Sequence, residues 1–233
     1  MPFLFNSTYL IFMLPGLILM GLAQWYVSAS YSKWSKVPNK SGLSGVEVAR
    51  RLVERGNLPG VSVEQVPGNL SDHYDPRKKV LRLSAGVAQS SSVAAAAIAA
   101  HELGHAVQDR EDYAPLRLRA ALVPAVNIGS YLGWILLMIG IFMQLAPVAW
   151  LGVAVFAGGA VFALATLPVE LNASARARQL LSTSGIITDE SESAGVNTVL
   201  NAAALTYVAA LFTAVLQLLY YVMLVSGMSG RRR

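Results

Sequence analysis

The charged residues of this 233-residue chain leave three long segments with no charge at all. Residues 1–32, 120–169 and 193–230 contain no Asp, Glu, Lys or Arg, and together they make up about half of the chain. A membrane-spanning helix needs about 20 consecutive apolar residues, and each segment is long enough to contain one. We therefore expect an integral membrane protein with polar segments between its spans, not an ordinary soluble domain.

The first and last charge-free segments each predict one transmembrane helix. The first span covers residues 1–27. A secretory signal peptide would have a basic start and a shorter apolar core, so this span is interpreted as an uncleaved anchor. The last span lies in residues 203–233, with an apolar part from Ala203 to Val225 followed by a basic tail, Arg231–Arg233.

The middle segment, residues 121–168, is long enough for two spans. Gln144-Leu-Ala-Pro147 interrupts it, and a proline near a polar side chain suits a turn at the membrane interface. The segment therefore predicts a helical hairpin formed by Leu122–Met143 and Val148–Leu167. Glycines on both helices predict that the two backbones approach closely: Gly133, Gly140, Gly152, Gly158 and Gly159.

Basic residues gather between the spans. Four spans place residues 28–120 and 170–202 on one side of the membrane, and these segments hold 15 of the 18 Lys and Arg residues. The positive-inside rule makes that side cytoplasmic, although Arg231–Arg233 on the other side oppose it. Span orientation and anionic lipid head groups explain the net charge of +5, so the lipid bilayer and not nucleic acid is the expected partner.

The polar segment 28–120 is expected to form a small α/β domain. Residues 44–56 carry a helical apolar stripe and end in a glycine, which predicts a short amphipathic helix. Residues 61–66 and 79–83 alternate like half-buried strands, with the turn-rich loop 67–76 between them. Two strands form a marginal sheet by themselves, so they must pack on helices.

A second helix of this domain, expected from Ser92 to Asp109, carries the sequence His101-Glu-Leu-Gly-His105. Histidines at positions i and i+4 lie on one helix face, so both imidazoles can reach one Zn²⁺ ion. Glu102 can accept a proton from a water at the metal as the general base of a metallopeptidase. The chain contains no cysteine, which excludes a thiolate site.

A catalytic zinc site needs a third protein ligand and one open position. The alternatives in this sequence are Glu170, Asp109, His73 and the pair Glu111 and Asp112. Glu170 is favoured because a carboxylate at the edge of an apolar span is costly unless it has a partner. Asp109 lies one turn beyond His105 and is expected to be out of reach.

Residues 169–202 are expected to form the helix of this third ligand, starting after Pro168, and a connector to the last span. Asn172 and Ser174 lie on this helix close to Glu170. They are candidates for side chains that orient the metal ligands or contact substrate. Simple helix surface is an equal alternative for both.

Four segments of the chain carry a family resemblance: Asp72-His-Tyr-Asp-Pro-Arg-Lys-Lys-Val-Leu-Arg-Leu-Ser84, Ala99-Ala-His-Glu-Leu-Gly-His-Ala-Val-Gln108, Pro168-Val-Glu-Leu-Asn-Ala-Ser-Ala-Arg-Ala177 and Val199-Leu-Asn-Ala-Ala-Ala-Leu-Thr-Tyr-Val208. Together they resemble the YugP-type neutral zinc metallopeptidases of bacterial membranes, and the resemblance extends from about Gly42 to Tyr220. This resemblance implies a gluzincin-like site in a multi-pass protein of the bacterial cell membrane. It implies His101, His105 and Glu170 as ligands of one zinc ion per chain, and Glu102 as base.

The chain is similar, more loosely, to the HtpX and CAAX-type membrane peptidases. Those proteins carry an Asp four residues after the ligand Glu, whereas this chain has Ser174 at that place. The role of that Asp is therefore not carried over.

His73 and Tyr74 lie next to the second predicted strand. One hypothesis is that strand 79–83 is an open sheet edge on which an extended substrate binds, and that His73 or Tyr74 stabilises the oxyanion. The alternative is that His73 is a structural hydrogen-bonding residue in a turn.

The sequence therefore predicts a mainly α integral membrane protein with four transmembrane helices and a small zincin-like α/β domain. Its predicted function is zinc-dependent hydrolysis of peptide bonds in a peptide or membrane-protein substrate at the cytoplasmic membrane surface. A metal-binding scaffold or regulatory protein without turnover is the main alternative. A metal-dependent hydrolase of lipids or other amides would have the same site, and a transporter is disfavoured because no predicted span contains an ionisable residue.

Overall fold

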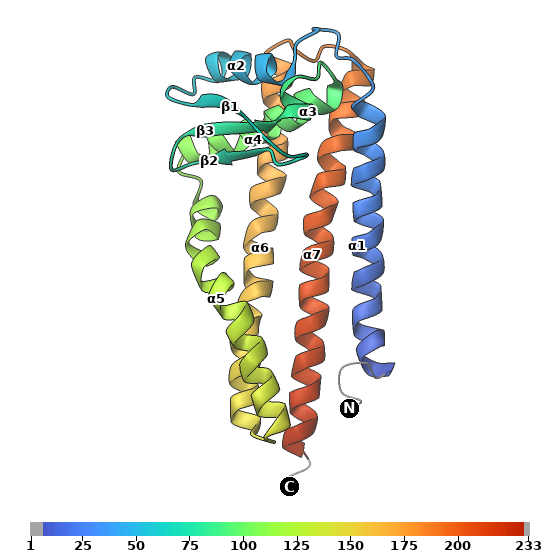
Figure 1. The fold of residues 1–233 in the computed structure, drawn as a ribbon, viewed down its shortest axis with the longest axis vertical. Helices are drawn as coiled ribbons and strands as arrows, with labels where there is room; N and C mark the ends of the chain where they lie inside the picture. Colours follow the sequence, from blue (N-terminus) through green and yellow to red (C-terminus); the bar gives the residue numbers. More distant parts are fainter. Residues whose placement is uncertain (1–6, 231–233) are drawn as a thin grey trace. The chain divides into compact units, whose positions relative to one another are not determined.

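The computed structural model describes residues 7–230, which form seven helices and three strands (Figure 1). The chain divides into two compact units. The bundle unit comprises residues up to 22, 117–168 and 206 onward, and the sheet unit comprises residues 23–116 and 169–205. The predicted basic tail at Arg231–Arg233 lies outside the described residues.

Four helices are long and apolar enough to cross a membrane: α1 (Ser7–Trp34), α5 (Ala114–Phe142), α6 (Ala146–Thr183) and α7 (Glu190–Gly230). Only 17–22% of the residues in their apolar windows are buried, as expected for helices with surfaces that face lipid. The four predicted spans are thus confirmed by length and composition, and the chain fits a multi-pass membrane protein.

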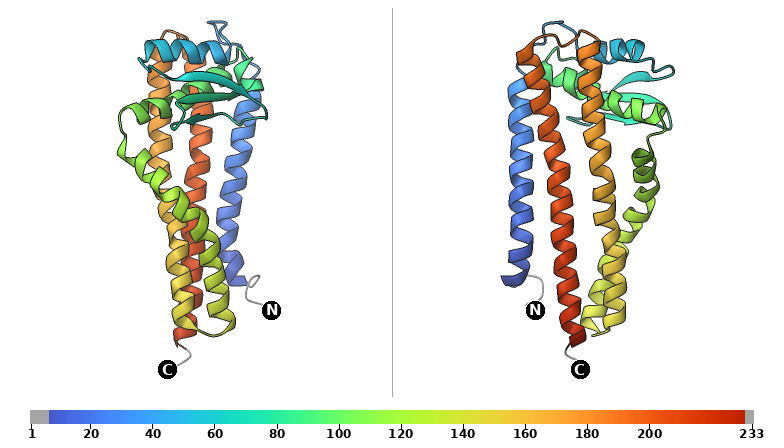
Figure 2. Two further views of the ribbon diagram at one scale, coloured as in Figure 1. Left: turned by 60° about the vertical axis from the view of Figure 1, so that its left-hand side comes forward. Right: turned by 180° about the vertical axis from the view of Figure 1, so that it is seen from behind.

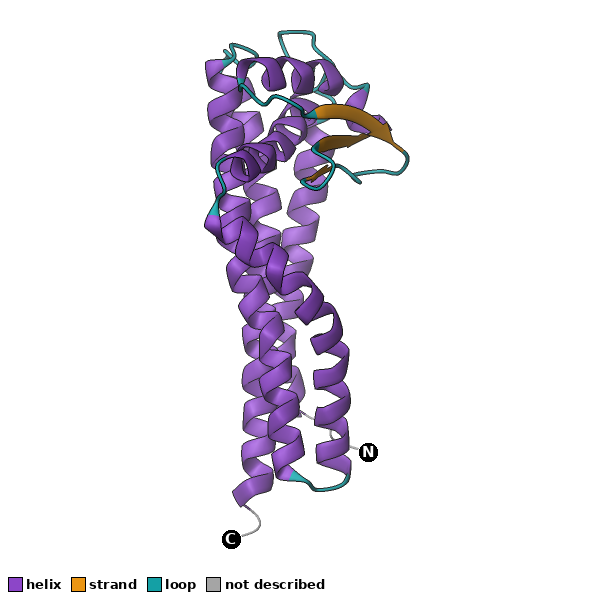
Figure 3. Cartoon of the chain, turned by 90° about the vertical axis from the view of Figure 1, so that its left-hand side faces the viewer, coloured by secondary structure: helices purple, strands orange, loops and turns teal. Residues whose placement is uncertain are grey.

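The bundle unit contains the predicted hairpin of α5 and α6. The two helices lie side by side and a short loop joins them (Figures 2 and 3). A Cβ atom on Gly140 would lie 2.3 Å from the Ala149 N, and one on Gly152 would lie 2.4 Å from the Leu137 N. The predicted close approach is therefore confirmed for these glycines and for Gly133, which meets the backbone of α6 at 2.8 Å.

Gly158 and Gly159 do not share this role. A Cβ atom on either would have no neighbour within 4 Å, so the expectation that they permit a close contact is wrong within the described residues. The apolar core of the bundle unit instead gathers around Leu137, Val153 and Tyr220.

The sheet unit is built on three strands, β1 (Ser62–Val66), β2 (His73–Asp75) and β3 (Val80–Ser84). β3 lies in the centre, parallel to β1 and antiparallel to β2. The unit also contains the helices α2 (Gly45–Arg55), α3 (Ala85–Ala88) and α4 (Val93–Arg110) and the parts of the long helices that lie in residues 23–34, 114–116, 169–183 and 190–205 (Figure 1).

α2 begins and ends where the sequence predicts. Ser44 and Glu47 form a capping box at its N-terminus, and Gly56 stands at its C-cap. Its buried face and the alanine-rich face of α4 belong to one apolar core together with Leu81 and Leu83 of β3.

Two expectations about the sheet are wrong. The loop 67–76 contains a strand, β2, so the sheet has three strands in the described residues rather than two. β3 is consequently the central strand, and the hypothesis that residues 79–83 form an open edge fails. The physical reason is that β2 occupies that edge, with Tyr74 paired to Leu81.

Three helices are longer than the sequence predicts. α1 continues past residue 27 to Trp34, because Tyr31 and Trp34 pack on the core of the sheet unit. α6 runs through Pro168 without a break, so Glu170 does not start a new helix. Membrane-protein helices tolerate an internal proline when neighbouring groups satisfy the freed backbone. α7 begins at Glu190, well before the predicted last span.

Candidate metal centre

α4 supplies the two histidines of the motif. Ser92 caps the helix by accepting a hydrogen bond from the Ala95 N–H at 3.1 Å, as its position in the sequence predicts. The alanines of the first half are buried and strongly favour helix. The helix therefore presents His101 and His105 on one face, one turn apart.

Gly104 of the motif lets α4 approach α6 closely. A Cβ atom on Gly104 would lie 2.4 Å from the backbone O of Ala173 and 3.0 Å from its carbonyl carbon. Only glycine fits here without moving the backbone of α6. The approach brings the motif histidines within reach of the α6 side chains on either side of Ala173.

The imidazoles of His101 and His105 converge on the carboxylate of Glu170. Its Oε2 atom lies 3.2 Å from His101 Nε2 and 3.7 Å from His105 Nε2. One ligand atom from each residue lies within 4.8 Å of the other two. The Glu170 side chain is 3% exposed and the two imidazoles are 14% and 12% exposed, so the cluster is largely shielded from water.

This donor set fits zinc. Two imidazole nitrogens and one carboxylate oxygen are the His₂Glu ligands of a catalytic zinc site, which leave the fourth position open. Ligand atoms about 2.1 Å from a tetrahedral zinc ion lie about 3.4 Å from one another. The separations of 3.2 and 3.7 Å agree with that value.

The charges at the cluster favour a cation. Burial by itself would lower the pKa of His105, but its contact with the Glu170 carboxylate and the charges of Glu102 and Glu170 outweigh burial and raise that pKa. A positive charge beside a buried carboxylate stabilises it. A proton or a metal ion can supply that charge.

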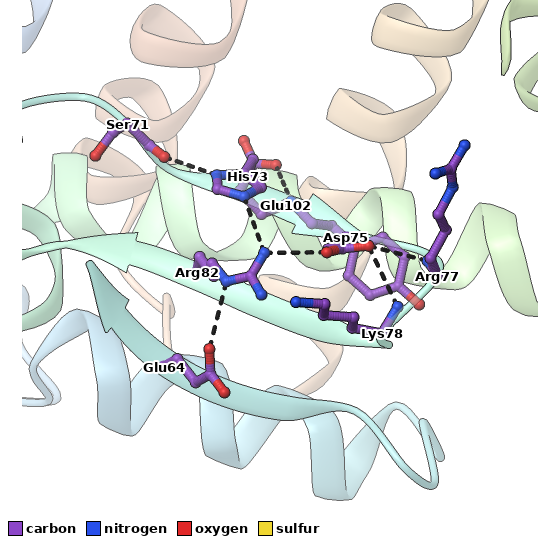
Figure 4. Close-up of polar contacts among 9 residues, drawn as sticks. Glu64, Ser71, His73, Asp75, Arg77, Lys78, Arg82 and Glu102 are labelled. Atoms are coloured by element: carbon purple, nitrogen blue, oxygen red, sulfur yellow. Dashed lines mark hydrogen bonds and ion pairs between the residues drawn. The ribbon is translucent and has the colours of Figure 1, made fainter. Parts of the chain in front are cut away.

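Glu102 is held at the open edge of the sheet. Its Oε2 atom accepts a hydrogen bond from the backbone N–H of Tyr74 in β2 at 3.2 Å (Figure 4). The Tyr74 hydroxyl points elsewhere and donates to Asp109 Oδ2 at 3.0 Å. Burial and this hydrogen bond raise the pKa of Tyr74. The backbone of Tyr74, and not its hydroxyl, therefore faces the motif glutamate.

His73 lies on the other face of the same strand, because successive strand residues point to opposite sides. Its Nδ1 atom faces the carbonyl of Ser71 at 2.9 Å and its Nε2 atom faces Arg82 at 3.4 Å (Figure 4). Arg82 also contacts Asp75 and Glu64 across the sheet. The structure thus places His73 in an exposed polar row and does not bring it to the three-residue cluster.

The other sequence candidates for a third ligand also lie outside the cluster. Asp109 accepts the Tyr74 hydroxyl, and Asp112 lies in the turn after α4 with a φ of +53°. Glu111 contacts Arg176 at 2.7 Å. The hydrogen bond from Arg176 holds the pKa of Glu111 below its usual range.

Both histidines have a polar partner on the ring nitrogen that faces away from Glu170. Ser174 Oγ lies 3.2 Å from His101 Nδ1, and Gln108 Oε1 lies 2.9 Å from His105 Nδ1. Metal-binding histidines commonly donate their second N–H to such a partner. The structure therefore brings the predicted Ser174 to the site.

Gln108 was missed by the sequence analysis as a site residue. It is fully buried, and its Nε2 donates to the Val169 carbonyl at 2.8 Å and to Asn172 Oδ1 at 3.0 Å. The signal that could have found it is its place three residues after His105, on the same helix face. Asn172, which the sequence analysis singled out, contacts Gln108 and Arg176.

The comparison with known protein families decides the classification. A family model described as "Putative neutral zinc metallopeptidase" matches residues 9–226. The chain belongs to this family. A protein of Bacillus subtilis (strain 168) named "Putative membrane protease YugP" is 44% identical over 202 residues, which cover 87% of this chain and 89% of that protein.

Membership of the neutral zinc metallopeptidase family confirms the resemblance drawn from the sequence. The zinc in the family name agrees with the three side chains that suit a zinc ion, His101, His105 and Glu170. No solved structure matches the chain. The zincin-like identity of the sheet unit therefore stays a prediction from the sequence.

Proposed function

We propose that this protein is a membrane-bound zinc metallopeptidase that hydrolyses peptide bonds, with His101, His105 and Glu170 as the ligands of one zinc ion. The observation that carries the proposal is the convergence of the three donor atoms on one point, with Glu102 on the same helix. The His₂Glu set leaves a coordination position for water or substrate.

Zinc bound there would lower the pKa of a water molecule and polarise the carbonyl of the scissile bond. The role of the protein groups follows from their contacts. The Tyr74 N–H holds Oε2 of Glu102, which leaves Oε1 to accept the proton of the attacking water. Glu102 then delivers this proton to the leaving amide nitrogen.

The edge strand β2 is the proposed binding place of an extended peptide. β2 pairs with β3 on one side, and the Tyr74 N–H points to Glu102 on its other side. A peptide added as a further strand would gain main-chain hydrogen bonds whatever its sequence, here with the carbonyl of Tyr74, because Glu102 holds the Tyr74 N–H. The scissile bond would then lie beside the motif glutamate.

We further propose that the sheet unit faces the cytoplasm of a bacterial cell and that the substrates are peptides or membrane proteins. Support comes from the 15 Lys and Arg residues in the segments 28–120 and 170–202. The four apolar helices make the lipid bilayer the surroundings of the protein, and no nucleic-acid partner is proposed.

The test is hydrolysis of casein and of a quenched-fluorescent peptide library by the purified full-length protein in detergent. Glu102→Gln should retain zinc and lose about 100- to 10,000-fold in rate, because it cannot accept the proton. Glu64→Gln, on the exposed outer face of the sheet, is the matched control and should keep full activity. Equal rates in wild type and Glu102→Gln would instead favour a metal-binding scaffold without turnover.

A further inference from the structure

We propose that Gln108 is a positioning residue that fixes the tautomer of His105, so that Nε2 is always the nitrogen presented to the metal. The inference rests on the proposed zinc site and deepens it. It follows from a row of polar contacts that runs from Glu111 through Arg176 and Asn172 to Gln108, all within the sheet unit.

Arg176 fixes the orientation of the Asn172 side-chain amide. Its Nη2 contacts Glu111 Oε2 at 2.7 Å, and its Nε donates to the side-chain oxygen of Asn172 at 2.7 Å. A guanidinium group has donors only, so the Asn172 atom that faces it must be the amide oxygen. The oxygen and nitrogen of Asn172 are therefore assigned by chemistry and not by the shape of the side chain.

Asn172 and Val169 in turn fix the orientation of the Gln108 side-chain amide. The Gln108 nitrogen faces two acceptors, the Asn172 oxygen at 3.0 Å and the Val169 carbonyl at 2.8 Å. A flipped amide would place three oxygens against one another in a fully buried place, which is costly. The Gln108 oxygen must therefore be the end that faces His105.

Gln108 then fixes which ring nitrogen of His105 carries the proton. An amide oxygen only accepts, so the proton of a neutral His105 ring must reside on Nδ1, 2.9 Å away. Nε2 is left with a lone pair, and it faces Glu170 Oε2 at 3.7 Å. Two acceptors that face each other create a place for a cation, which is what a metal site requires.

His101 is not fixed in this way. Its Nδ1 faces the Ser174 hydroxyl at 3.2 Å, and a hydroxyl can either donate or accept. The two ligands therefore differ. His105 carries its proton on Nδ1 before metal binds, whereas His101, whose Nε2 lies 3.2 Å from the Glu170 carboxylate, must move its proton to Nδ1 when metal binds, and the Ser174 hydroxyl allows this change. Loss of Gln108 should cost more zinc affinity than loss of Ser174.

The experiment combines a zinc titration with a tautomer measurement on the full-length protein. Zinc affinity is measured by competition with a chelator for wild type, Gln108→Leu, Gln108→Glu and the control Gln89→Leu, which makes the same change at an exposed glutamine. Gln108→Leu should lose about 10- to 100-fold in zinc affinity. Gln108→Glu keeps an acceptor for the His105 N–H but turns its second oxygen toward the oxygens of Val169 and Asn172, so it should recover only part of that loss. Gln89→Leu should match wild type.

The tautomer is read from two-bond ¹H–¹⁵N spectra of the metal-free protein labelled on its three histidines, at alkaline pH where the rings are neutral. Wild-type His105 should carry its proton on Nδ1, and Gln108→Leu should show a mixture. A proton on Nε2 in wild type, or unchanged affinity in Gln108→Leu, would overturn the inference while zinc-dependent peptidase activity still stood. A wild type that binds no zinc would overturn the proposed function separately, because the tautomer is measured without metal.

Discussion

Two helix pairs in this protein pack closely through a glycine, but the surroundings of the two glycines differ. In the sheet unit, Gly104 of α4 meets the backbone of α6 at Ala173. In the bundle unit, Gly140 of α5 meets the backbone of α6 at Ala149. Both glycines stand where a Cβ atom would lie closer than 2.5 Å to a backbone atom, so both helix pairs lie close together.

The difference is in what surrounds each contact. Gly140 meets Ala149, which belongs to one apolar core with Leu137 and Val153. The neighbours of Gly104 on α4 and α6 are histidine, glutamate, glutamine and serine side chains that hydrogen-bond one another. Close approach by itself makes a packed helix pair, and it makes a metal site only where each buried polar group also has a partner.

Of the changes that test these two contacts, Gly104→Ala has the largest expected effect. The added Cβ forces α4 away from α6, and a shift of about 1 Å between catalytic groups can cost about 100-fold in rate. We expect zinc affinity and peptidase rate to fall together by about that factor. A variant with wild-type zinc affinity would show that the close approach at Ala173 is not what places Glu170.

A smaller effect is expected from Ser174→Ala. The variant removes the hydroxyl beside His101 Nδ1 but leaves the tautomer of His105 locked by Gln108. We expect about a tenfold loss of zinc affinity, at the low end of the range for partners of metal ligands. Chelator competition measures it, and a larger loss than in Gln108→Leu would reverse the proposed order of the two histidines.

Tyr74→Phe should leave zinc binding unchanged. It removes the hydrogen bond from the hydroxyl to Asp109 but keeps the backbone N–H that holds Glu102. The expected result is a loss of about 1 kcal/mol in the free energy of unfolding. Thermal unfolding of the zinc-loaded protein measures this loss. A collapse of the peptidase rate would show that the hydroxyl itself takes part in catalysis.

Gly140→Ala tests the contact between α5 and α6 and should not change zinc binding. The added methyl group overpacks the α5–α6 contact, which costs about 1–3 kcal/mol of stability in a well-packed core. Zinc content per folded chain should remain that of wild type. Loss of zinc from this variant would mean that the two glycine contacts are not independent.

The sequence predicted those parts of the protein whose signals are local. Charge-free segments of spanning length predicted the four apolar helices, and the predicted helix starts at Ser44 and Ser92 agree with the N-caps of α2 and α4. The HExxH spacing placed His101 and His105 on one helix face. Family resemblance and the cost of a carboxylate at a membrane edge pointed to Glu170, which the structure brings to the histidines.

The parts that were not predicted depend on tertiary contacts. The three residues of β2 have no apolar alternation, and they form a strand because Tyr74 pairs with Leu81 and packs toward α4. Pro168 suggested a helix start, yet α6 continues through it. Gln108 gave no motif signal, since its role depends on Val169 and Asn172, about 60 residues further along the chain.

The most direct test of the account is the zinc content of purified wild type, His105→Ala, Glu170→Ala and Asp109→Ala. Asp109→Ala is the matched control, because Asp109 lies on the same helix but binds Tyr74. The account predicts about one zinc ion per chain in wild type and in Asp109→Ala, and little or none in the other two. Full zinc occupancy in Glu170→Ala, or no zinc in folded wild type after zinc is added, would contradict it.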